Sequence, residues 1–336
     1  MVTDFKKIAV LGSNSFTGSH FVDHVLKNTD SEVLGISRSE EYKPIFLPYL
    51  YLKKRSDRFK FAQYDLNKDL EKIIGVLDAE KPEVIVNFAA QGEVRNSWKW
   101  PEQWFETNCM AVVRLADKLK ERDYLKRYLN VSTPEVYGNT GRNISESHHY
   151  KPSTPYASSK LAGDIFLMNL FKRYNFPVVS TRSANVYGIH QQLYRIIPRT
   201  IIYLKSNRTI ELHGGGEALR SFIHARDVAD GTLRAIKHGR NGEFYHLATE
   251  KEELKIRDIV HKICDMMSYD FDRSTISLSE NFGQDSIFSL DSSKARKELG
   301  WKPEEGFDKG ISEMIRWIDK EWETIKTSPL DYVHKD

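Results

Sequence analysis

The sequence predicts an α/β protein that contains a doubly wound parallel sheet and a smaller domain of mixed structure. Short apolar segments typical of strands alternate with longer segments of helical periodicity through the first half of the 336 residues. The alternation becomes irregular in the second half. A chain of this length also exceeds the usual size of a single core, which favours two domains.

Each element of the first half is expected from its local pattern. Short runs of strand-type composition predict strands over Ile8–Leu11, Glu32–Ile36, Val84–Ala89, Tyr128–Ser132 and Val178–Arg182, and a weaker run predicts one over Phe59–Tyr64. Apolar residues three or four positions apart predict helices over Gly18–Lys27, Trp104–Arg122 and Pro155–Tyr174. This order of strands and helices is typical of a parallel sheet with helices on both faces.

The second half mixes shorter elements. Helical patterns cover Ile196–Lys205, Ile256–Met267 and Gly310–Glu321, while Ile210–Leu212 is a short strand and Phe244–Leu247 is expected to rejoin the sheet. From about Thr324 the chain is expected to form a loosely held tail.

The composition excludes several classes of protein. The net charge is only +3, with 50 basic and 47 acidic residues spread along the chain, so no nucleic-acid or membrane partner is expected. The two cysteines, Cys109 and Cys264, cannot form a disulfide framework or a cysteine-rich metal site. The adjacent His148 and His149 lack the spacing of metal ligands, and no metal is expected. Because neither a signal peptide nor an apolar stretch of about 20 residues is found, we expect a cytoplasmic protein.

A glycine-containing turn directly follows the first expected strand. It runs from Gly12 through Ser15, Phe16 and Thr17 to Gly18, where a helix begins. Small residues here allow the backbone to approach a pyrophosphate, and the N-terminus of the helix offers N–H groups and a positive dipole. The turn therefore predicts a dinucleotide site, although an ordinary strand-to-helix connection has the same composition.

The end of the second strand bears on the choice of dinucleotide. An acidic residue at this position would bind the adenosine ribose of NAD, whereas this chain has Ser37 and Arg38. Hydroxyl and guanidinium groups suit a 2′-phosphate, so NADP is favoured and NAD stays possible. The alternative is a surface arginine without a ligand.

Tyr156 and Lys160 are four residues apart and therefore share one face of a predicted helix. A lysine ammonium beside a phenol favours the phenolate, which can act as a base. Ser132 or Thr133, at the end of the preceding strand, is placed to bond the same substrate oxygen. The spacing alone occurs by chance on many helices, and only the dinucleotide turn upstream makes a catalytic role the better interpretation.

Together these motifs resemble the extended short-chain dehydrogenases/reductases, and among them the nucleotide-sugar 4,6-dehydratases. The similarity covers roughly residues 5–320. The matching segments, in the order of the family, are Gly12–Gly18, Asp65-Leu66, Asn87–Ala90, Glu106–Asn108, Ser132–Gly138, Tyr156–Lys160, Arg182–Gly188, Ile196–Pro198, Arg220–His224 with Asp227-Val228, and Gly300–Pro303.

The resemblance implies the roles of further segments. It implies a Rossmann-type NAD(P)-binding domain over residues 1–186, to which segments near 222–249 return, and a nucleotide-sugar-binding domain over 187–325. It also implies a homodimer, built by the helices around Glu106–Lys120 and Pro155–Phe171. Further cofactor contacts implied are Asp65, Leu66, Phe88, Ala89, Ala90, Gln91 and Ser132, and the substrate contacts implied are Ser97, Asn185, Arg199 and Arg220.

The family likeness also implies a lyase reaction of deoxysugar biosynthesis. Tyr156, helped by Thr133 and Lys160, takes the proton of the C4 hydroxyl while hydride leaves C4 for a tightly bound, recycled cofactor. Glu135 then removes the acidified C5 proton, water leaves from C6, and hydride returns to C6 to give a 4-keto-6-deoxy sugar. Two residues depart from the family pattern: Pro134 stands where dTDP-glucose enzymes have an acid, and Ser15 stands where a glycine is usual.

Three alternatives stay open at this point. A nucleotide-sugar epimerase or a 5,6-dehydratase works through the same 4-ketone, although Glu135 argues against an epimerase. A non-catalytic NADP-sensing module is the third, but it has no need of a phenolate base. Among substrates, GDP-linked sugars are slightly favoured because Ser37-Arg38, Gln91 and the missing acid resemble the GDP-mannose enzymes.

Overall fold

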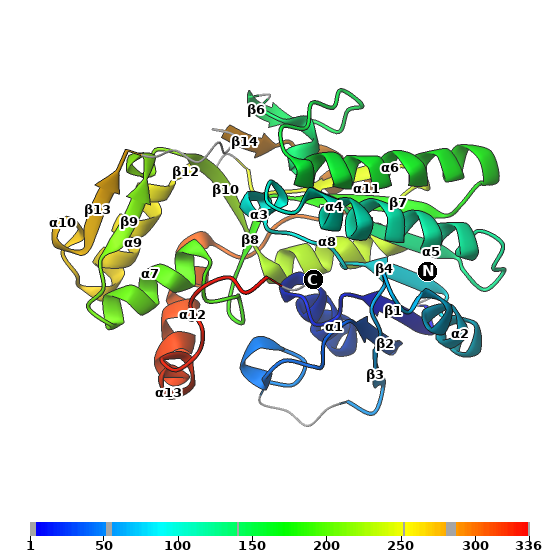
Figure 1. Ribbon diagram of the computed structural model, residues 1–336, viewed down its shortest axis with the longest axis horizontal. Helices are drawn as coiled ribbons and strands as arrows, with labels where there is room; N and C mark the ends of the chain where they lie inside the picture. The colour runs from blue at the N-terminus through cyan, green and yellow to red at the C-terminus, as the bar shows by residue number, and fades with distance from the viewer. Residues whose placement is uncertain (1–4, 52–55, 140, 251–252, 280–286, 335–336) are drawn as a thin grey trace.

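The main sheet has seven parallel strands in the order β3-β2-β1-β4-β5-β7-β11 (Figure 1). The computed structural model describes residues 5–51, 56–139, 141–250, 253–279 and 287–334. The strands are β1 (Lys7–Leu11), β2 (Glu32–Ser37), β3 (Phe59–Gln63), β4 (Val84–Asn87), β5 (Arg127–Val131), β7 (Val178–Ser183) and β11 (Phe244–Leu247). The strand order reverses between β1 and β4, which is where ligands of such sheets bind. The predicted α/β class, the doubly wound sheet and the return of Phe244–Leu247 to it are confirmed.

Both faces of the main sheet are covered by helices, which explains why its central strands β1 and β4 are almost wholly apolar. Ile8 and Val10 of β1 face one core with α1 (Phe16–Asn28), α8 (Ala225–His238) and α11 (Ser293–Leu299). Ala9 and Leu11 face the other core with α2 (Leu70–Glu80), α5 (Ala111–Leu119) and α6 (Pro155–Tyr174).

The segment after β4 contains the helix expected over Trp104–Arg122, with a π-helical turn inside it. It forms α3 (Val94–Ser97), α4 (Pro101–Phe105), a π-helical turn η2 (Glu106–Met110) and then α5. Such π-helical turns often occur at functional sites, because they re-aim one side chain without ending the helix. Here the turn carries Asn108, which is almost fully buried.

A third core lies at the carboxyl ends of the main strands. Its mixed sheet joins β10 (Leu219–His224) antiparallel to β12 (Glu253–Lys255) and parallel to β14 (Ile287–Leu290) and β8 (Asn185–Tyr187). The remaining elements are β6 (Gly141–Ile144), α7 (Ile196–Lys205), β9 (Ile210–His213), α9 (Ile256–Met267), α10 (Phe271–Ser274), β13 (Thr275–Leu278), α12 (Phe307–Lys320), α13 (Trp322–Ile325) and the 3-10 turns η1 (Pro44–Phe46), η3 (Pro134–Tyr137) and η4 (Gly214–Gly216). Apolar residues of α7, α9, α12 and α13 make this core, called the second lobe below.

The expectation of a loosely held tail from Thr324 is wrong for the residues that the structure describes. Ile325 is fully buried in the second lobe, and Leu330 packs against the same core. Farther along, the ring of His334 stacks on Trp100. Apolar and aromatic side chains at intervals therefore hold a segment that lacks regular structure after α13.

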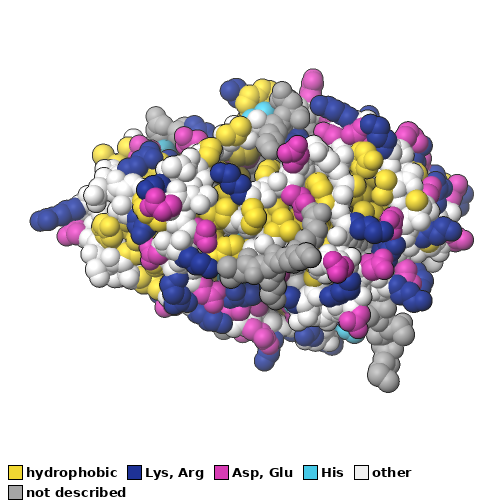
Figure 2. Space-filling model, turned by 90° about the horizontal axis from the view of Figure 1, so that it is seen from below, with side chains coloured by type: hydrophobic (Ala, Val, Ile, Leu, Met, Phe, Trp, Pro, Cys, Tyr) yellow, Lys and Arg dark blue, Asp and Glu magenta, His cyan; other side chains and the backbone are white. Residues whose placement is uncertain are grey.

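The surface carries no single-sign face in the view of Figure 2, where basic and acidic side chains are interspersed. Within the described ranges, no helix has both the length and the apolarity needed to cross a membrane.

Candidate active site

A cleft of about 940 Å³ lies where the main strands end and the second lobe begins. It gathers most of the site residues predicted from sequence, which lie far apart along the chain. The predicted residues that line it are Gly12, Ser15, Phe16, Thr17, Ser37, Arg38, Asp65, Leu66, Phe88, Ala89, Ala90, Gln91, Ser132, Thr133, Glu135, Tyr156, Lys160, Asn185 and Arg220.

The turn between β1 and α1 leaves its glycines no room for side chains. Gly12 has φ +77°, and a Cβ on it would lie 2.7 Å from the backbone nitrogen of Ala89. A Cβ on Gly18 would lie 2.3 Å from the Gly12 carbonyl oxygen. Ser15 is the N-cap of α1, and its Oγ accepts a hydrogen bond from Gly18 N at 3.1 Å. The result is a close-packed cradle at a helix N-terminus, which fits the pyrophosphate of a dinucleotide.

The Ser37 side chain makes its contacts within the turn between β1 and α1. It is buried at the end of β2, and its Oγ accepts from Asn14 N at 3.0 Å and lies 3.2 Å from Ser13 Oγ. Arg38 lines the cleft and is only partly buried. Any contact with a 2′-phosphate therefore falls to Arg38 more than to Ser37.

The turn that carries Glu135 begins where β5 ends. Thr133 is its N-cap, and Thr133 Oγ1 accepts from Glu135 N at 3.3 Å. Pro134 occupies the first position of the 3-10 turn, where its missing N–H costs nothing and its fixed φ suits the turn. Proline thus stiffens the segment that presents Glu135 to the cleft.

Tyr156 and Lys160 project from the first turns of α6, where Thr154 is the N-cap. Burial, together with the nearby Glu135 carboxylate, raises the pKa of the Tyr156 phenol, and a hydrogen bond with Thr133 and the charge of Arg195 offset this rise only in part. Lys160 is 3% exposed, so burial lowers its pKa, and its Nζ donates to the Val131 carbonyl at 2.7 Å. Thr133 and Glu135 thus both lie close enough to Tyr156 to affect the pKa of its phenol.

A buried ion pair lies directly beneath this turn. Arg182 Nη2 and Asp164 Oδ2 are 2.9 Å apart, and both side chains are at most 1% exposed. Asp164 also accepts from Ser132 Oγ at 2.5 Å and from Asn130 Nδ2 at 3.0 Å. The pair therefore ties β5, β7 and α6 together under the cleft.

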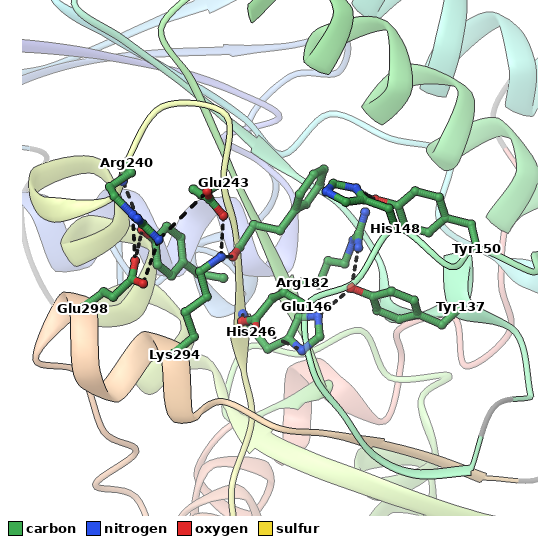
Figure 3. A network of polar contacts seen from close by, with 12 residues as sticks. Tyr137, Glu146, His148, Tyr150, Arg182, Arg240, Glu243, His246, Lys294 and Glu298 are labelled. Carbon is green, nitrogen blue, oxygen red and sulfur yellow. Dashed lines mark hydrogen bonds and ion pairs between the residues drawn. The ribbon is translucent and has the colours of Figure 1, made fainter. Parts of the chain in front are cut away.

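The same arginine continues into a chain of polar contacts shown in Figure 3. Arg182 Nη1 donates to the Tyr137 hydroxyl at 2.6 Å, and this hydroxyl lies 2.9 Å from His246 Nε2. Because His246 Nδ1 lies 3.1 Å from the Ile144 carbonyl, the neutral ring donates there and accepts from Tyr137. Burial, together with the charge of Arg182, lowers the pKa of His246 to about 3.

Three predicted residues lie elsewhere. Gly18 belongs to the cradle but packs on Gly12 rather than facing the cleft. Ser97 is fully buried and donates within α3 to the Val94 carbonyl at 2.6 Å. Arg199 lies over the ring of Tyr203 on α7, 4.9 Å from its centroid. The structure does not bring these three to the cleft wall.

Sequence reasoning missed a charged pair in the cleft. Arg195 Nη1 lies 3.5 Å from Glu93 Oε2, which joins the segment after β4 to the start of α7. Arg195 also lies over the ring of Tyr194, 5.0 Å from its centroid. The only available signal was position, because Arg195 immediately precedes the recognised Ile196–Pro198 motif.

Asn108 was part of a recognised motif without a role. Its Oδ1 accepts from Gln91 N at 2.9 Å, and its Nδ2 donates to the Gln91 carbonyl and to Ser159 Oγ, each at 3.0 Å. It therefore couples the loop after β4 to the helix of Tyr156. Among the residues that the structure describes, no three His, Cys, Asp or Glu side chains gather as a metal site would require.

Comparison with known proteins places this geometry in a family. The model of the GDP-mannose 4,6 dehydratase family matches residues 10–314. The chain belongs to the GDP-mannose 4,6 dehydratase family. The predicted membership of the nucleotide-sugar 4,6-dehydratase group is thereby confirmed.

Individual members of the family match over most of their length. Mouse dTDP-D-glucose 4,6-dehydratase is 29% identical over 329 residues, covering 96% of this chain and 91% of the relative. The crystal structure of DesIV, a dTDP-glucose 4,6-dehydratase from Streptomyces venezuelae with NAD and a second ligand bound, has a TM-score of 0.85 at 28% identity, with 95% of this chain and 98% of that one covered.

An epimerase has nearly the same fold. The structure of UDP-glucuronic acid 4-epimerase from Bacillus cereus, in complex with UDP-glucuronic acid and NAD, has a TM-score of 0.83 at 27% identity, covering 94% of this chain and 99% of that one. The fold therefore serves both reactions, and the residues in the cleft must distinguish them.

Proposed function

We propose that the protein is an NAD(P)-dependent lyase that dehydrates a nucleotide-diphosphate hexose to a 4-keto-6-deoxy sugar. The observation that carries the proposal is the convergence of Thr133, Glu135 and Tyr156 in one cleft beside the glycine cradle. An epimerase needs the phenol, whereas the adjacent carboxylate serves only a reaction that removes a second proton.

The cradle residues Gly12, Ser15 and Thr17 would hold the dinucleotide, with Arg38 on the adenosine side. When bound, the cofactor accepts hydride from C4 and later returns it to C6. Tyr156 takes the proton of the C4 hydroxyl, and Thr133 holds the same oxygen. Lys160, buried in the wall of the cleft, would help to orient the bound cofactor.

Glu135 performs the second proton transfer. The 4-ketone acidifies the C5 hydrogen, and the carboxylate held at the start of η3 removes it. Pro134 has no proton to donate, so Glu135, once protonated, passes its proton to the departing C6 oxygen in a syn elimination. One carboxyl group therefore acts first as base and then as acid, and C5 takes a new proton from solvent when hydride returns to C6.

The substrate would enter the half of the cleft nearest the second lobe. Asn185 on β8 and Arg220 on β10 lie on neighbouring strands, where Phe222 pairs with Asn185 in register. Arg220 is proposed to bind the diphosphate through its guanidinium. This arrangement supports a division into a cofactor domain, residues 1–186 with segments near 222–249, and a nucleotide-sugar domain, residues 187–325.

The finer choices rest on fewer residues. Arg38 favours NADP over NAD, and Ser37-Arg38, Gln91 and Pro134 favour a GDP-linked sugar. The named relatives above act on dTDP- and UDP-linked sugars, so all these nucleotides belong in the test.

A homodimer and a cytoplasmic location complete the proposal. The two helical segments expected at a dimer interface carry exposed apolar side chains, namely Phe105 and Met110 near η2 and Ile165 on α6, at 38%, 40% and 46% exposure. Light scattering on the wild type and on Ile165→Asp would test the dimer. Cys109 and Cys264 are free thiols, as is usual in a reducing compartment.

The decisive experiment incubates the protein with GDP-, UDP-, dTDP- and CDP-hexoses and follows their masses. Loss of one water from a single substrate, with no net consumption of cofactor, is expected, and deuterated water should place one deuterium at C5. An isomer of unchanged mass would instead indicate an epimerase. The NADP-sensing alternative is supported if the protein binds the cofactor but converts none of the sugars, and if Tyr156→Phe binds the cofactor as the wild type does.

A further inference from the structure

The segment from Ser328 to His334 bridges the two halves of the molecule across the mouth of the cleft. It leaves the second lobe after α13, where Ser328 N donates to the Ile325 carbonyl at 3.0 Å and Leu330 packs on the core. In Figure 1 the red end of the chain runs from the α12–α13 pair to the centre of the molecule, where its C mark lies. This stretch is called the strap below.

The far end of the strap is fastened to the side of the main sheet. The His334 ring stacks on Trp100 with centroids 4.2 Å apart and planes 7° apart, and it lies parallel to Trp104 at 5.6 Å. His334 Nε2 is also 2.5 Å from Gln103 Oε1. Trp104 is fully buried in α4, which packs against α6, the helix of Tyr156. The anchor is therefore rigid and close to the catalytic helix.

The middle of the strap faces the ligand space. Tyr332 and Val333 line the same cleft as the glycine cradle and the catalytic residues. The Tyr332 ring meets Tyr194 edge-on at 5.4 Å. Tyr332 also lies within electrostatic reach of Arg38 on the cofactor side and of Glu93 and Arg195 on the substrate side.

We infer that Ser328–His334 is part of the binding site, with Tyr332 a contact residue of the bound dinucleotide and His334 the anchor that keeps it there. This inference rests on the proposed function, because that reaction returns the hydride in each turnover. A cofactor that never needs to leave can stay enclosed by a strap, whereas a cofactor exchanged in every cycle would need the strap to open each time. The strap therefore slows dinucleotide release without slowing catalysis.

The test is the release rate of bound NADPH or NADH, followed by fluorescence after mixing the complex with excess oxidised cofactor. We expect His334→Ala and Tyr332→Ala to release it about three- to tenfold faster, as loss of one aromatic pair implies. His334→Phe keeps the stack on Trp100 and should release it at nearly the wild-type rate. His149→Ala, at an exposed histidine before α6, is the matched control.

The outcomes separate the two proposals. Unchanged release in both His334→Ala and Tyr332→Ala, with melting temperatures near wild type, would overturn the strap and leave the dehydratase proposal standing. A wild-type protein that binds neither NADPH nor NADH would overturn both. Faster release in His334→Ala that His334→Phe restores would support the stacked anchor, because a general loss of folding would not be rescued in this way.

Discussion

Arg182 and Asp164 form an ion pair at 2.9 Å that is sealed from solvent directly under the turn that carries Glu135. Asp164 Oδ2 also receives the Ser132 hydroxyl, so the pair holds the residue that precedes Thr133. Removing one partner leaves the other charge buried without compensation.

Asp164→Asn should therefore lower the free energy of unfolding by about 3–5 kcal/mol. Denaturant titration measures this loss. Asp117→Asn, which removes an exposed pair with Lys120 on α5, should cost less than about 1 kcal/mol. Equal losses of unfolding free energy in the two variants would show that the buried pair stabilises the protein no more than an exposed one.

Glu135→Gln should separate oxidation from elimination. The amide cannot accept the C5 proton, so product formation should fall about 10²- to 10⁴-fold, while oxidation at C4 persists. Stopped-flow absorbance of the reduced cofactor, with mass spectrometry of the sugar, measures both steps. Normal water loss in this variant would remove Glu135 from the mechanism.

Arg195→Gln should move the pH dependence of turnover. The charge of Arg195 lowers the pKa of Tyr156, against the effects of burial, Glu135 and Asp164, which raise it. Losing that charge raises the pKa, so the rate should begin to rise only at higher pH than in the wild type. Arg199→Gln, one turn farther along α7, is the control and should leave the profile in place.

Arg38→Ala should discriminate between the two dinucleotides. Because Ser37 Oγ already accepts a hydrogen bond from Asn14 N, we expect Arg38 to make the main contact with the 2′-phosphate of NADP. A charge-assisted hydrogen bond of this kind contributes about 1.5–3 kcal/mol. Calorimetric titration should show NADP affinity about 10- to 100-fold lower and NAD affinity nearly unchanged. An equal loss of affinity for NADP and NAD would show that Arg38 does not distinguish the 2′-phosphate from the 2′-hydroxyl.

His246 should make stability depend on pH in a defined window. Burial and Arg182 lower its pKa from 6.5 to about 3, so between these values the unfolded chain binds the extra proton. Stability is then lost as the pH falls below about 6.5, at about 1.4 kcal/mol per pH unit for this residue. Unfolding at several pH values should show a flatter dependence for His246→Gln, whereas His149→Gln should behave as wild type.

The fold could be predicted because its information is local. Apolar runs such as Val84–Asn87 and the periodicity of Pro155–Tyr174 are visible in the sequence, and parallel pairing follows from their alternation. The cradle was also predictable, since Gly12 has no tolerable substitute beside Ala89.

The contacts that the sequence could not reveal join distant segments. Arg182, Tyr137 and His246 come from β7, η3 and β11, and only the finished sheet brings them together. The π-helical turn inside the helix after β4 could not be predicted, because it has no periodic signature of its own. The segment after Thr324 was wrongly expected to be loose, because the rings that hold it, Trp100 and Trp104, lie far upstream and stack with His334.

The edge position of β11 has a consequence for how the chain is made on the ribosome. Its neighbour β7 emerges first, and everything from β8 to α8 must follow before Phe244–Leu247 can cover it. Until then β7 presents an unpaired strand edge of the kind that associates with other chains. Efficient production should therefore depend on uninterrupted synthesis that keeps this interval short, or on chaperone cover during it.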